Sequence, residues 1–436
     1  MLAKSKRLKR TQILAVVFLT IAGIVNYLDR STLSIANHSI SQELHLSASQ
    51  MGLLLSAFSL AYAFAQLPVG ALLDRFGSRA MLGLGMLVWS VAQLAGGFIQ
   101  SLNHFLFARV VLGAAEAPLF PAGAKVVTEW FAVHERGGPT GTFIASSTIA
   151  PMIAPPLLTA IMLTTSWRTM FIVMGVLGVL VSIGWYVVYR NRGEVTLTED
   201  EEAYLDQNEV VRAKRTGGIS LAEWGGLFKL PNTWGMIFGF MGVIYMVWLY
   251  LTWLPGYLEA ERHISIAHTG WLVAIPYIFG TFGMVGSGHI ADFLLRRGMA
   301  PIRSRKWPVC TGLIGAAAFT VPAAFTPSTA MAITYISLAM FFVNMASGSA
   351  WALVTVAAPK HLVASLGSLQ NFGGYLGGSF APLITGIVVD RTHSFVNALL
   401  ISAAIAFAAA LVYLFVVREI KPVTSSDPIS TLPSKI

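Results

Sequence analysis

The hydrophobic positions of this chain are gathered into long runs, and the charged positions lie between the runs. Ten stretches of 18 or more residues contain no Asp, Glu, Lys or Arg. A helix that crosses a bilayer needs about 20 mainly apolar residues, so each stretch is long enough to cross. The stretches cover residues 11–28, 44–73, 80–108, 137–167, 169–189, 230–258, 263–291, 307–359, 361–389 and 392–417.

The longest of these stretches has about twice the required length. The turn residues Thr326-Pro327-Ser328 divide it into two spans. One further span, between Leu106 and Trp130, is interrupted by charged residues. The runs are too long for the alternating strands of a membrane barrel, and a helix pairs every backbone group within its own segment. The sequence therefore predicts an all-α membrane protein with twelve transmembrane helices.

Composition agrees with this class. Of 436 residues, 55% are hydrophobic and 11% are charged, against about 25% charged in soluble domains. The single cysteine, Cys310, excludes a disulfide within the chain. His263, His268 and His289 lack the spacing of metal ligands near acidic residues. We therefore expect no metal and no bound cofactor.

The basic residues predict the orientation. With the N-terminus inside and twelve alternating spans, only Arg168, Arg262 and Arg391 fall in outer loops, and Arg30 and Arg109 lie within spans. The other 24 of the 29 basic residues are then on the inner side, as the positive-inside rule requires. We predict a multi-pass protein of a bacterial inner membrane with both termini in the cytoplasm. The net charge of +9 reflects this topology and does not indicate a nucleic-acid partner.

The polar segment in the middle of the chain predicts two halves. We expect a six-helix half over 1–190, a cytoplasmic loop over 191–229, a second six-helix half over 230–420 and a cytoplasmic tail over 421–436. Weak internal echoes support the division: Gly70-x-x-x-Asp74 corresponds to Gly288-x-x-x-Asp292, and Ala154-Pro155 corresponds to Ala381-Pro382. Two equivalent halves predict a substrate site between them near the membrane centre.

Four charged residues lie inside the predicted spans and are functional candidates because such side chains are costly in a membrane. By helical rise, Asp29 and Arg30 lie ~12 and ~10 Å below the outer end of the first span, and Arg109 and Glu116 lie ~6 and ~17 Å deep in the fourth. One interpretation is structural: Arg109 neutralises Asp29 and Glu116 and holds helices together. The other is functional: the two acids carry protons. We favour the second, because buried ion pairs rarely add stability.

The loop after the second span carries a family resemblance. Gly70, Asp74, Arg75, Gly77 and Arg79 occupy the positions of the signature loop of the major facilitator superfamily, which that resemblance implies is a cytoplasmic gating loop. The resemblance implies the fold of that superfamily, two six-helix halves that expose a central site to each side of the membrane in turn.

Further segments resemble the anion:cation symporter family. These segments are Asn26-Tyr27-Leu28-Asp29-Arg30, Arg109-x-x-x-Gly113-x-x-Glu116-Ala117-Pro118, Trp130-Phe131, His134-Glu135-Arg136, Leu251-Thr252-Trp253-Leu254-Pro255 and Asn371-Phe372-Gly373-Gly374. The match runs from about residue 10 to 420. It implies proton-coupled uptake of a small organic anion such as a sugar acid, another carboxylate or a sulfonate, with protons as the second partner and a monomer as the working unit.

The resemblance also implies roles. Asp29 and Glu116 carry protons, Arg109 is their switching partner, and Arg30 binds the acid group of the substrate. Arginine suits this task because its planar fork binds a carboxylate through two nitrogens. Further substrate contacts implied by the resemblance are Tyr27, Tyr62 and Asn371.

The chain departs from the sugar-acid members of that family at one such contact. A glutamine that contacts sugar hydroxyls in those members corresponds to Ser147, and polar positions before Trp351 become Gly348 and Ala350. A site with fewer amide donors is less suited to a polyhydroxylated substrate. This favours a shorter or less hydroxylated anion, with sugar acids still open.

Two other functions share some of these features. A proton-driven exporter of drugs has the same fold, but the fifth span reads Ser146-Ser147-Thr148-Ile149-Ala150-Pro151, a poor match to the Gly-Pro-rich motif of such exporters, and Arg30 would repel a cationic drug. A sensor that binds the anion without moving it usually carries a signalling domain, and the chain has only a short loop and tail. We do not expect an enzyme, because no nucleophile, base and orienting group lie at suitable positions.

Overall fold

The computed structural model describes residues 4–132, 135–206, 225–357 and 363–419. Throughout these ranges the regular structure is helical. The tail predicted over 421–436 and residues 207–224 of the predicted central loop lie outside the described residues. The helices are α1 (Lys6–Ile35), α2 (Asn37–Glu43), α3 (Ala48–Gly96), α4 (Leu102–Glu116), α5 (Leu119–Trp130), α6 (Gly137–Thr164), α7 (Trp167–Val188), α8 (Glu199–Leu205), α10 (Pro231–Ala260), α11 (Ile266–Arg296), α12 (Pro301–Phe325), α13 (Thr329–Ala357), α14 (Val363–Thr392) and α15 (Val396–Val416), with short 3₁₀ turns at Arg192–Glu194 and Leu227–Lys229.

Twelve described segments are long and apolar enough to cross a membrane, as predicted. Helix α3 contains two of them, Ala48–Gly70 and Arg75–Gly96, and α4 and α5 together form one, Leu102–Trp130. Six spans precede the short helix α8 and six follow it. The predicted break at Thr326-Pro327-Ser328 is also present, because α12 ends at Phe325 and α13 begins at Thr329.

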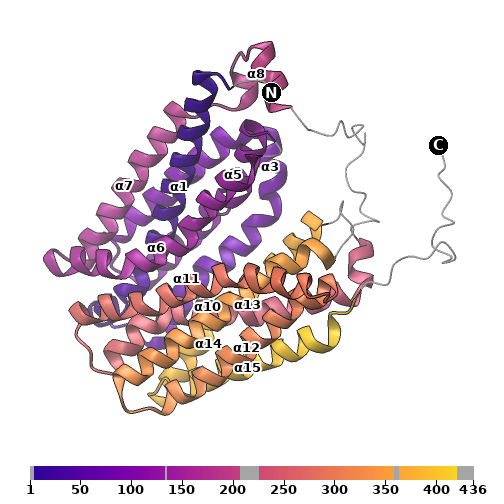
Figure 1. Ribbon diagram of the computed structural model, residues 1–436. Helices are drawn as coiled ribbons and strands as arrows, with labels where there is room; N and C mark the ends of the chain where they lie inside the picture. The colour runs from indigo at the N-terminus through magenta and orange to yellow at the C-terminus, as the bar shows by residue number, and fades with distance from the viewer. Residues whose placement is uncertain (1–3, 133–134, 207–224, 358–362, 420–436) are drawn as a thin grey trace.

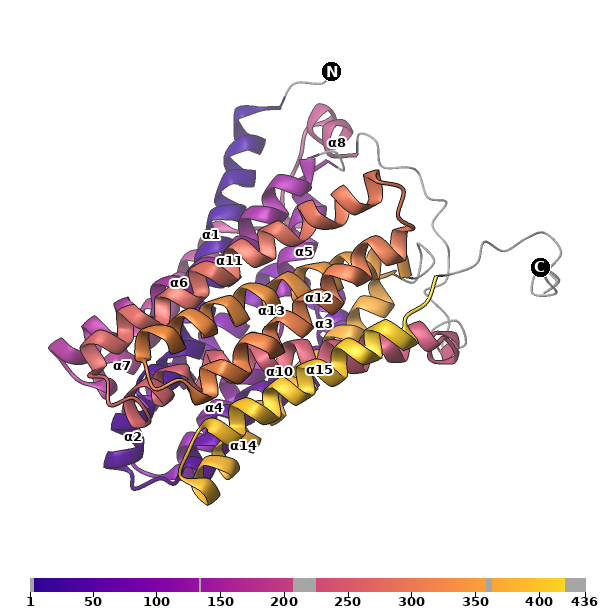
Figure 2. The same cartoon turned by 60° about the horizontal axis from the view of Figure 1, so that its bottom comes forward.

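The spans form two bundles (Figures 1 and 2). The first contains α1 to α7 and the second α10 to α15. Across the boundary α3 packs against α14, α6 against α11, and α1 against α10. The bundles lie together at one end and spread at the other, where α1 begins and α15 ends. We call these the closed end and the spread end.

Glycines on the boundary helices show the same difference. Near the closed end, a Cβ on Gly52 of α3 would lie 2.5 Å from the Pro382 carbonyl oxygen of α14, and one on Gly270 of α11 would lie 2.7 Å from the Thr159 hydroxyl of α6. Nearer the spread end of the same helices, a Cβ on Gly70, Gly141, Gly286 or Gly288 would meet nothing within 4 Å. The halves are therefore in tight contact at one end and apart at the other.

Hydrogen bonds also join the halves at the closed end. The Ser34 hydroxyl of α1 lies 2.9 and 2.8 Å from the carbonyl oxygens of Leu251 and Thr252 on α10. The Asp390 carboxylate, near the end of α14, accepts from the backbone N–H groups of Ala48 (2.8 Å) and Ser49 (2.7 Å), at the start of α3. These contacts hold α1 and α3 of the first bundle against the second.

Candidate functional site

The charged candidates meet in the first bundle. Asp29 and Glu116 are fully buried, and Arg109 and Arg30 are 3% and 5% exposed. Helix α1 carries Asp29 and Arg30, and α4 carries Arg109 and Glu116. Glu116 is the last residue of α4, because Ala117-Pro118 breaks the span there and proline cannot donate a backbone hydrogen bond. The break places the Glu116 carboxylate at a helix end in the middle of the membrane.

Arg30 and Glu116 form a buried ion pair. The Arg30 Nε donates to Glu116 Oε2 at 2.8 Å, and the two side chains are 2% and 0% exposed. The Nη2 of Arg30 is buried without a hydrogen-bond partner. The Glu116 carboxylate therefore occupies the Nε donor of the guanidinium, and the Nη2 donors are unused. The predicted structural pairing of Arg109 with Glu116 is absent from the described ion pairs, in which Glu116 is bound by Arg30.

Three aromatic rings surround the Arg30 guanidinium. Its carbon lies 4.8 Å from the ring centre of Tyr27, 5.0 Å from that of Phe58 and 4.8 Å from that of Tyr62. At these distances each ring face attracts the cation, and the attraction is larger when the site is dry. The rings therefore hold the guanidinium in place without using its N–H donors.

Two aromatic residues of the second bundle contact the rings beside Arg30. Tyr375 of α14 lies 4.5 Å from Tyr62, centre to centre, and Trp248 of α10 lies 5.9 Å from Phe58 and 6.3 Å from Tyr375. Phe58 and Tyr62 are themselves 6.1 Å apart. The four rings form a continuous contact between the halves beside Arg30. Sequence reasoning missed Phe58, Trp248 and Tyr375, since nothing in the spacing of aromatic residues separates them from ordinary core residues.

Asp29 and Arg109 are buried, and several of their polar atoms have no hydrogen-bond partner. Both carboxylate oxygens of Asp29 and the Nε and Nη1 of Arg109 have no hydrogen-bond partner. In the described part of the chain no ion pair within 4 Å joins the two residues, although the Arg109 guanidinium lies 5.1 Å from the Phe58 ring. Buried polar groups are nearly always paired, so unpaired ones call for a functional explanation.

The other residues predicted to contact the substrate lie in different surroundings. Asn371 lies at the boundary, where its Nδ2 donates to the Gln66 Oε1 of α3 at 3.0 Å. Tyr27 and Tyr62 touch Arg30, as described above. The Ser147 hydroxyl lies beside the Tyr27 hydroxyl and donates to the Ile144 carbonyl of its own helix at 2.8 Å. Gln66 did not figure in the sequence prediction, and an amide side chain among apolar residues in the inner part of a span is the signal that could have found it.

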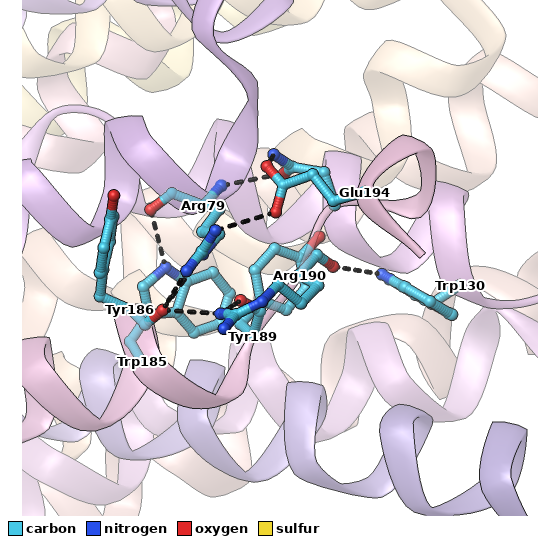
Figure 3. Close-up of polar contacts among 8 residues, drawn as sticks. Arg79, Trp130, Trp185, Tyr186, Tyr189, Arg190 and Glu194 are labelled. Atoms are coloured by element: carbon cyan, nitrogen blue, oxygen red, sulfur yellow. Dashed lines mark hydrogen bonds and ion pairs between the residues drawn. The ribbon is translucent and has the colours of Figure 1, made fainter. Parts of the chain in front are cut away.

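We call Arg30 with Glu116, Tyr27, Phe58 and Tyr62 the Arg30 cluster. The predicted gating loop lies at the spread end and does not touch this cluster. Gly77 has φ 77°, in the region that favours glycine, and a Cβ there would lie 2.7 Å from the Asn191 amide nitrogen. Arg79 donates to the Tyr186 carbonyl at 3.1 and 2.9 Å and pairs with Glu194 at 3.1 Å (Figure 3). Gly70 and Arg75 are exposed, and the side chain of Asp74 lies outside the described residues.

These geometries allow one kind of chemistry. A buried arginine held by rings can bind an anion, and two buried carboxyls can bind protons. Among the described residues no group of three or more His, Cys, Asp or Glu side chains could hold a metal ion. The arrangement is suited to binding small charged species between two halves.

Comparison with known proteins shows the family to which the chain belongs. Residues 19–382 match the family described as Major Facilitator Superfamily. The chain is similar to the "Probable L-galactonate transporter" of Escherichia coli (strain K12), with 48% identity over 95% of this chain and 91% of that protein. It is 32% identical to a "Probable galactarate/D-glucarate transporter" of the same organism over 96% and 97% of the two chains. It is 30% identical to the "Hexuronate transporter" of Bacillus subtilis over 94% of each.

A solved structure supports the fold. The crystal structure of a bacterial homologue of the human lysosomal transporter Spinster, in an inward-facing and occupied conformation, matches with a TM-score of 0.77 at 18% identity, over 94% of this chain and 97% of that one. The predicted fold is thereby confirmed, and so is the prediction that the chain is a transporter and not an enzyme. This multi-pass membrane protein belongs to the Major Facilitator Superfamily.

Proposed function

We propose that the protein takes up a small organic anion of the sugar-acid type together with protons, by alternating access across a bacterial inner membrane. Its relatives are named as transporters of galactonate, galactarate or D-glucarate, and hexuronate, and they match over nearly the whole chain. All of these compounds are hydroxylated carboxylates. A buried arginine between two bundles is a suitable ligand for such an acid group.

The observation that carries the proposal is the Arg30–Glu116 ion pair. Glu116 is itself a carboxylate, and it occupies the guanidinium that the substrate carboxylate needs. Substrate and Glu116 therefore compete for Arg30. Because Arg30 binds Glu116 only through Nε and its Nη2 has no partner, an incoming carboxylate that engages two nitrogens makes the better pair.

A proton resolves this competition. If Glu116 stayed ionised after losing Arg30, a buried charge would be left unpaired, at a cost of several kcal/mol. A proton on Glu116 removes that charge and leaves Arg30 free for the substrate. Proton and anion then favour each other's binding, and this mutual dependence is what couples their transport.

Asp29 and Arg109 provide a second place for a proton. The Asp29 carboxylate is fully buried and has no hydrogen-bond partner, a state that a bound proton stabilises. Arg109, on the same helix as Glu116, is the group whose movement toward or away from Asp29 would change that acid's hold on its proton. We assign Asp29 and Glu116 as the proton carriers and Arg109 as the switch.

The predicted topology orients the two ends, and uptake as the direction of transport rests on the resemblance to the anion:cation symporter family. With the basic loops in the cytoplasm, the spread end faces the cytoplasm and the closed end faces the outside. In this arrangement the site releases its cargo inward, and the loop with Gly70, Asp74, Arg75, Gly77 and Arg79 belongs to the inner gate. One chain contains all the groups that this cycle uses, so a monomer suffices.

The first test uses purified protein in liposomes. An inward proton gradient should accelerate accumulation of L-galactonate, and equal uptake with and without the gradient would refute coupling. Arg30→Ala should abolish binding in calorimetry. Arg30→Lys should lose most of it, because an ammonium cannot reproduce the planar fork. Binding by Arg30→Ala within threefold of the wild type would exclude Arg30 as the acid-group ligand.

The second test separates coupling from movement. Glu116→Gln fixes a neutral side chain, so gradient-driven accumulation should be lost while exchange of labelled for unlabelled anion persists. Asp29→Asn should damage both activities more, since it removes one of the two acids whose charges face the buried Arg109. Glu259→Gln, a partly buried acid of α10 outside the cluster, is the matched control and should keep accumulation. Full accumulation by Glu116→Gln would move the proton role to another residue.

A further inference from the structure

Gln66 lies one helical turn from the Arg30 cluster, on the side of the spread end. It follows Tyr62 by four residues on α3, so the two side chains share a face of the helix and are about 6 Å apart along its axis. Tyr62 touches the Arg30 guanidinium at 4.8 Å. A side chain at Gln66 is therefore within reach of the far end of a molecule whose acid group is bound at Arg30.

The Gln66 amide meets a second amide from the other half. Asn371 Nδ2 donates to Gln66 Oε1 at 3.0 Å, and of the described hydrogen bonds that join the halves this one lies nearest the spread end. One turn further along α3, a Cβ on Gly70 would meet nothing within 4 Å. The amide pair thus stands where the contact between α3 and α14 gives way to open space.

Most of the hydrogen-bonding capacity of this pair is unused. An amide side chain has two N–H donors and a carbonyl acceptor with two lone pairs. The single bond leaves the NH₂ group of Gln66 and the carbonyl oxygen of Asn371 without a partner among the described hydrogen bonds. Both residues are partly exposed, so these groups are open to a ligand. Donors and acceptors placed side by side match hydroxyl groups, which both donate and accept.

We propose that Gln66 determines specificity by hydrogen-bonding the hydroxyls of the substrate, with Asn371 as its partner across the boundary. This inference rests on the proposed function and narrows its substrate class to polyhydroxylated monocarboxylates. The acid group is bound at Arg30 and the hydroxylated chain extends toward Gln66. Gln66 thereby supplies from α3 the amide that Ser147 does not provide on α6, where the Ser147 hydroxyl donates to the Ile144 carbonyl and keeps only its oxygen as an acceptor.

The test compares two acids that differ in hydroxylation. Calorimetry measures binding of L-galactonate and of butanoate to the purified full-length protein and to Gln66→Leu. The variant should bind L-galactonate at least tenfold more weakly and butanoate within twofold of the wild type, because removal of an amide leaves hydroxyls unpaired in the site. Gln66→Asn, which keeps an amide on a shorter stem, should lose less. Gln42→Leu, the same replacement on the exposed α2 helix, should change neither affinity.

A double variant sharpens the assignment. Gln66→Leu with Ser147→Gln returns an amide from α6 and should recover part of the L-galactonate affinity. If Gln66 only held the two halves together, both acids would weaken in parallel, and that result would overturn the inference while leaving the proposed function intact. Unchanged L-galactonate affinity in Gln66→Leu would also overturn it. Failure of the wild type to bind L-galactonate would instead refute the substrate class of the proposed function.

Discussion

The start of helix α3 and the turn at Gly77, between the two spans of this helix, are built for opposite purposes. At its start, two backbone N–H groups donate to Asp390 of the other half, and Gly52 lets α14 approach. At the turn, Gly77 and Arg79 contact Tyr186 of the first half and Asn191 and Glu194 at the start of the central segment. The start of α3 joins the two bundles, and the Gly77 turn makes none of its described contacts with the second bundle.

This difference shows which contacts must break during transport. A transporter that alternates between two open forms has to separate the closed end, and that separation breaks the Asp390 bonds and the glycine contacts. The contacts of Gly77 and Arg79 can survive, since they move with their own half. Changes at the closed end should therefore shift the balance between conformations, whereas changes at the Gly77 loop should act on stability in the present state.

The largest effect is expected from a side chain that blocks the closed end. In Gly386→Val the new Cβ would lie 2.3 Å from the Ala48 carbonyl oxygen, and backbone cannot move aside cheaply. Overlap of this kind costs about 3 kcal/mol, more than a hundredfold in the ratio of closed to open molecules. Spin labels on exposed Gln42 and His268, one in each half, should report a longer distance. Gly288→Val, which meets nothing within 4 Å, should leave the distance unchanged.

A smaller shift is expected from Asp390→Ala. The variant removes a charged acceptor from two N–H groups at the start of α3, a loss of about 1–2 kcal/mol. The population open at this end should rise about tenfold, again read from the Gln42 and His268 labels. Glu43→Ala removes an acid at the same end whose described partners lie in one half, and it should not alter the distance distribution. An unchanged distribution in Asp390→Ala would mean that other contacts alone hold the end closed.

Gly77→Ala tests the turn at Gly77, the other region of the comparison. Its positive φ and the close Asn191 amide should together lower the melting temperature, by an amount equivalent to about 1–3 kcal/mol. Gly298→Ala has a similar φ of 87° with nothing within 4 Å, so it isolates the backbone contribution. The label distance should stay constant in both variants. A longer distance in Gly77→Ala would show that this loop also controls closure.

The spans were predictable from the sequence for a simple physical reason. Charged residues are excluded from the hydrocarbon region, so gaps between charges measure the membrane crossings, and Pro327 marks the break within the longest gap. The placement of Asp29, Arg30, Arg109 and Glu116 within the first and fourth spans followed from the same gaps. These predictions use distances along one helix, which a sequence contains directly.

Contacts between helices were a different matter. The sequence gives no rotation of α1 against α4, so it did not indicate that Glu116 pairs with Arg30 while Asp29 stays unpaired. The Gln66–Asn371 bond joins residues 305 positions apart, on faces that only packing brings together. The roles implied by the family resemblance named Asn371 but not Gln66, and the substrate preference drawn from Ser147 neglected the amide that α3 provides.

The smallest predicted effect is the pH-dependent stabilisation by the ion pair of Glu43 and Arg168. This pair lies at the closed end, within the first half. Glu43 of α2 accepts hydrogen bonds from Arg168 and from the Trp167 indole, and these bonds lower the pKa of the Glu43 carboxyl. The lowered pKa means that ionised Glu43 stabilises the folded protein above its unfolded pKa, near 4.3. This contribution is lost as the pH falls through the lower folded value. Since the Glu43 side chain is 48% exposed, water screens the pair and the contribution is below about 1 kcal/mol.

Arg168→Gln measures this contribution. The variant should melt slightly below the wild type at pH 7, by one or two degrees at most for so small an energy in a protein of this size. The difference should shrink as the pH is lowered past 4, because protonated Glu43 no longer attracts Arg168. The label distance should be the same in both proteins, since Glu43, Trp167 and Arg168 all belong to the first half. A difference in melting that is independent of pH would assign the effect to the bonds from Arg168 to the Gly97 and Ile99 carbonyls instead.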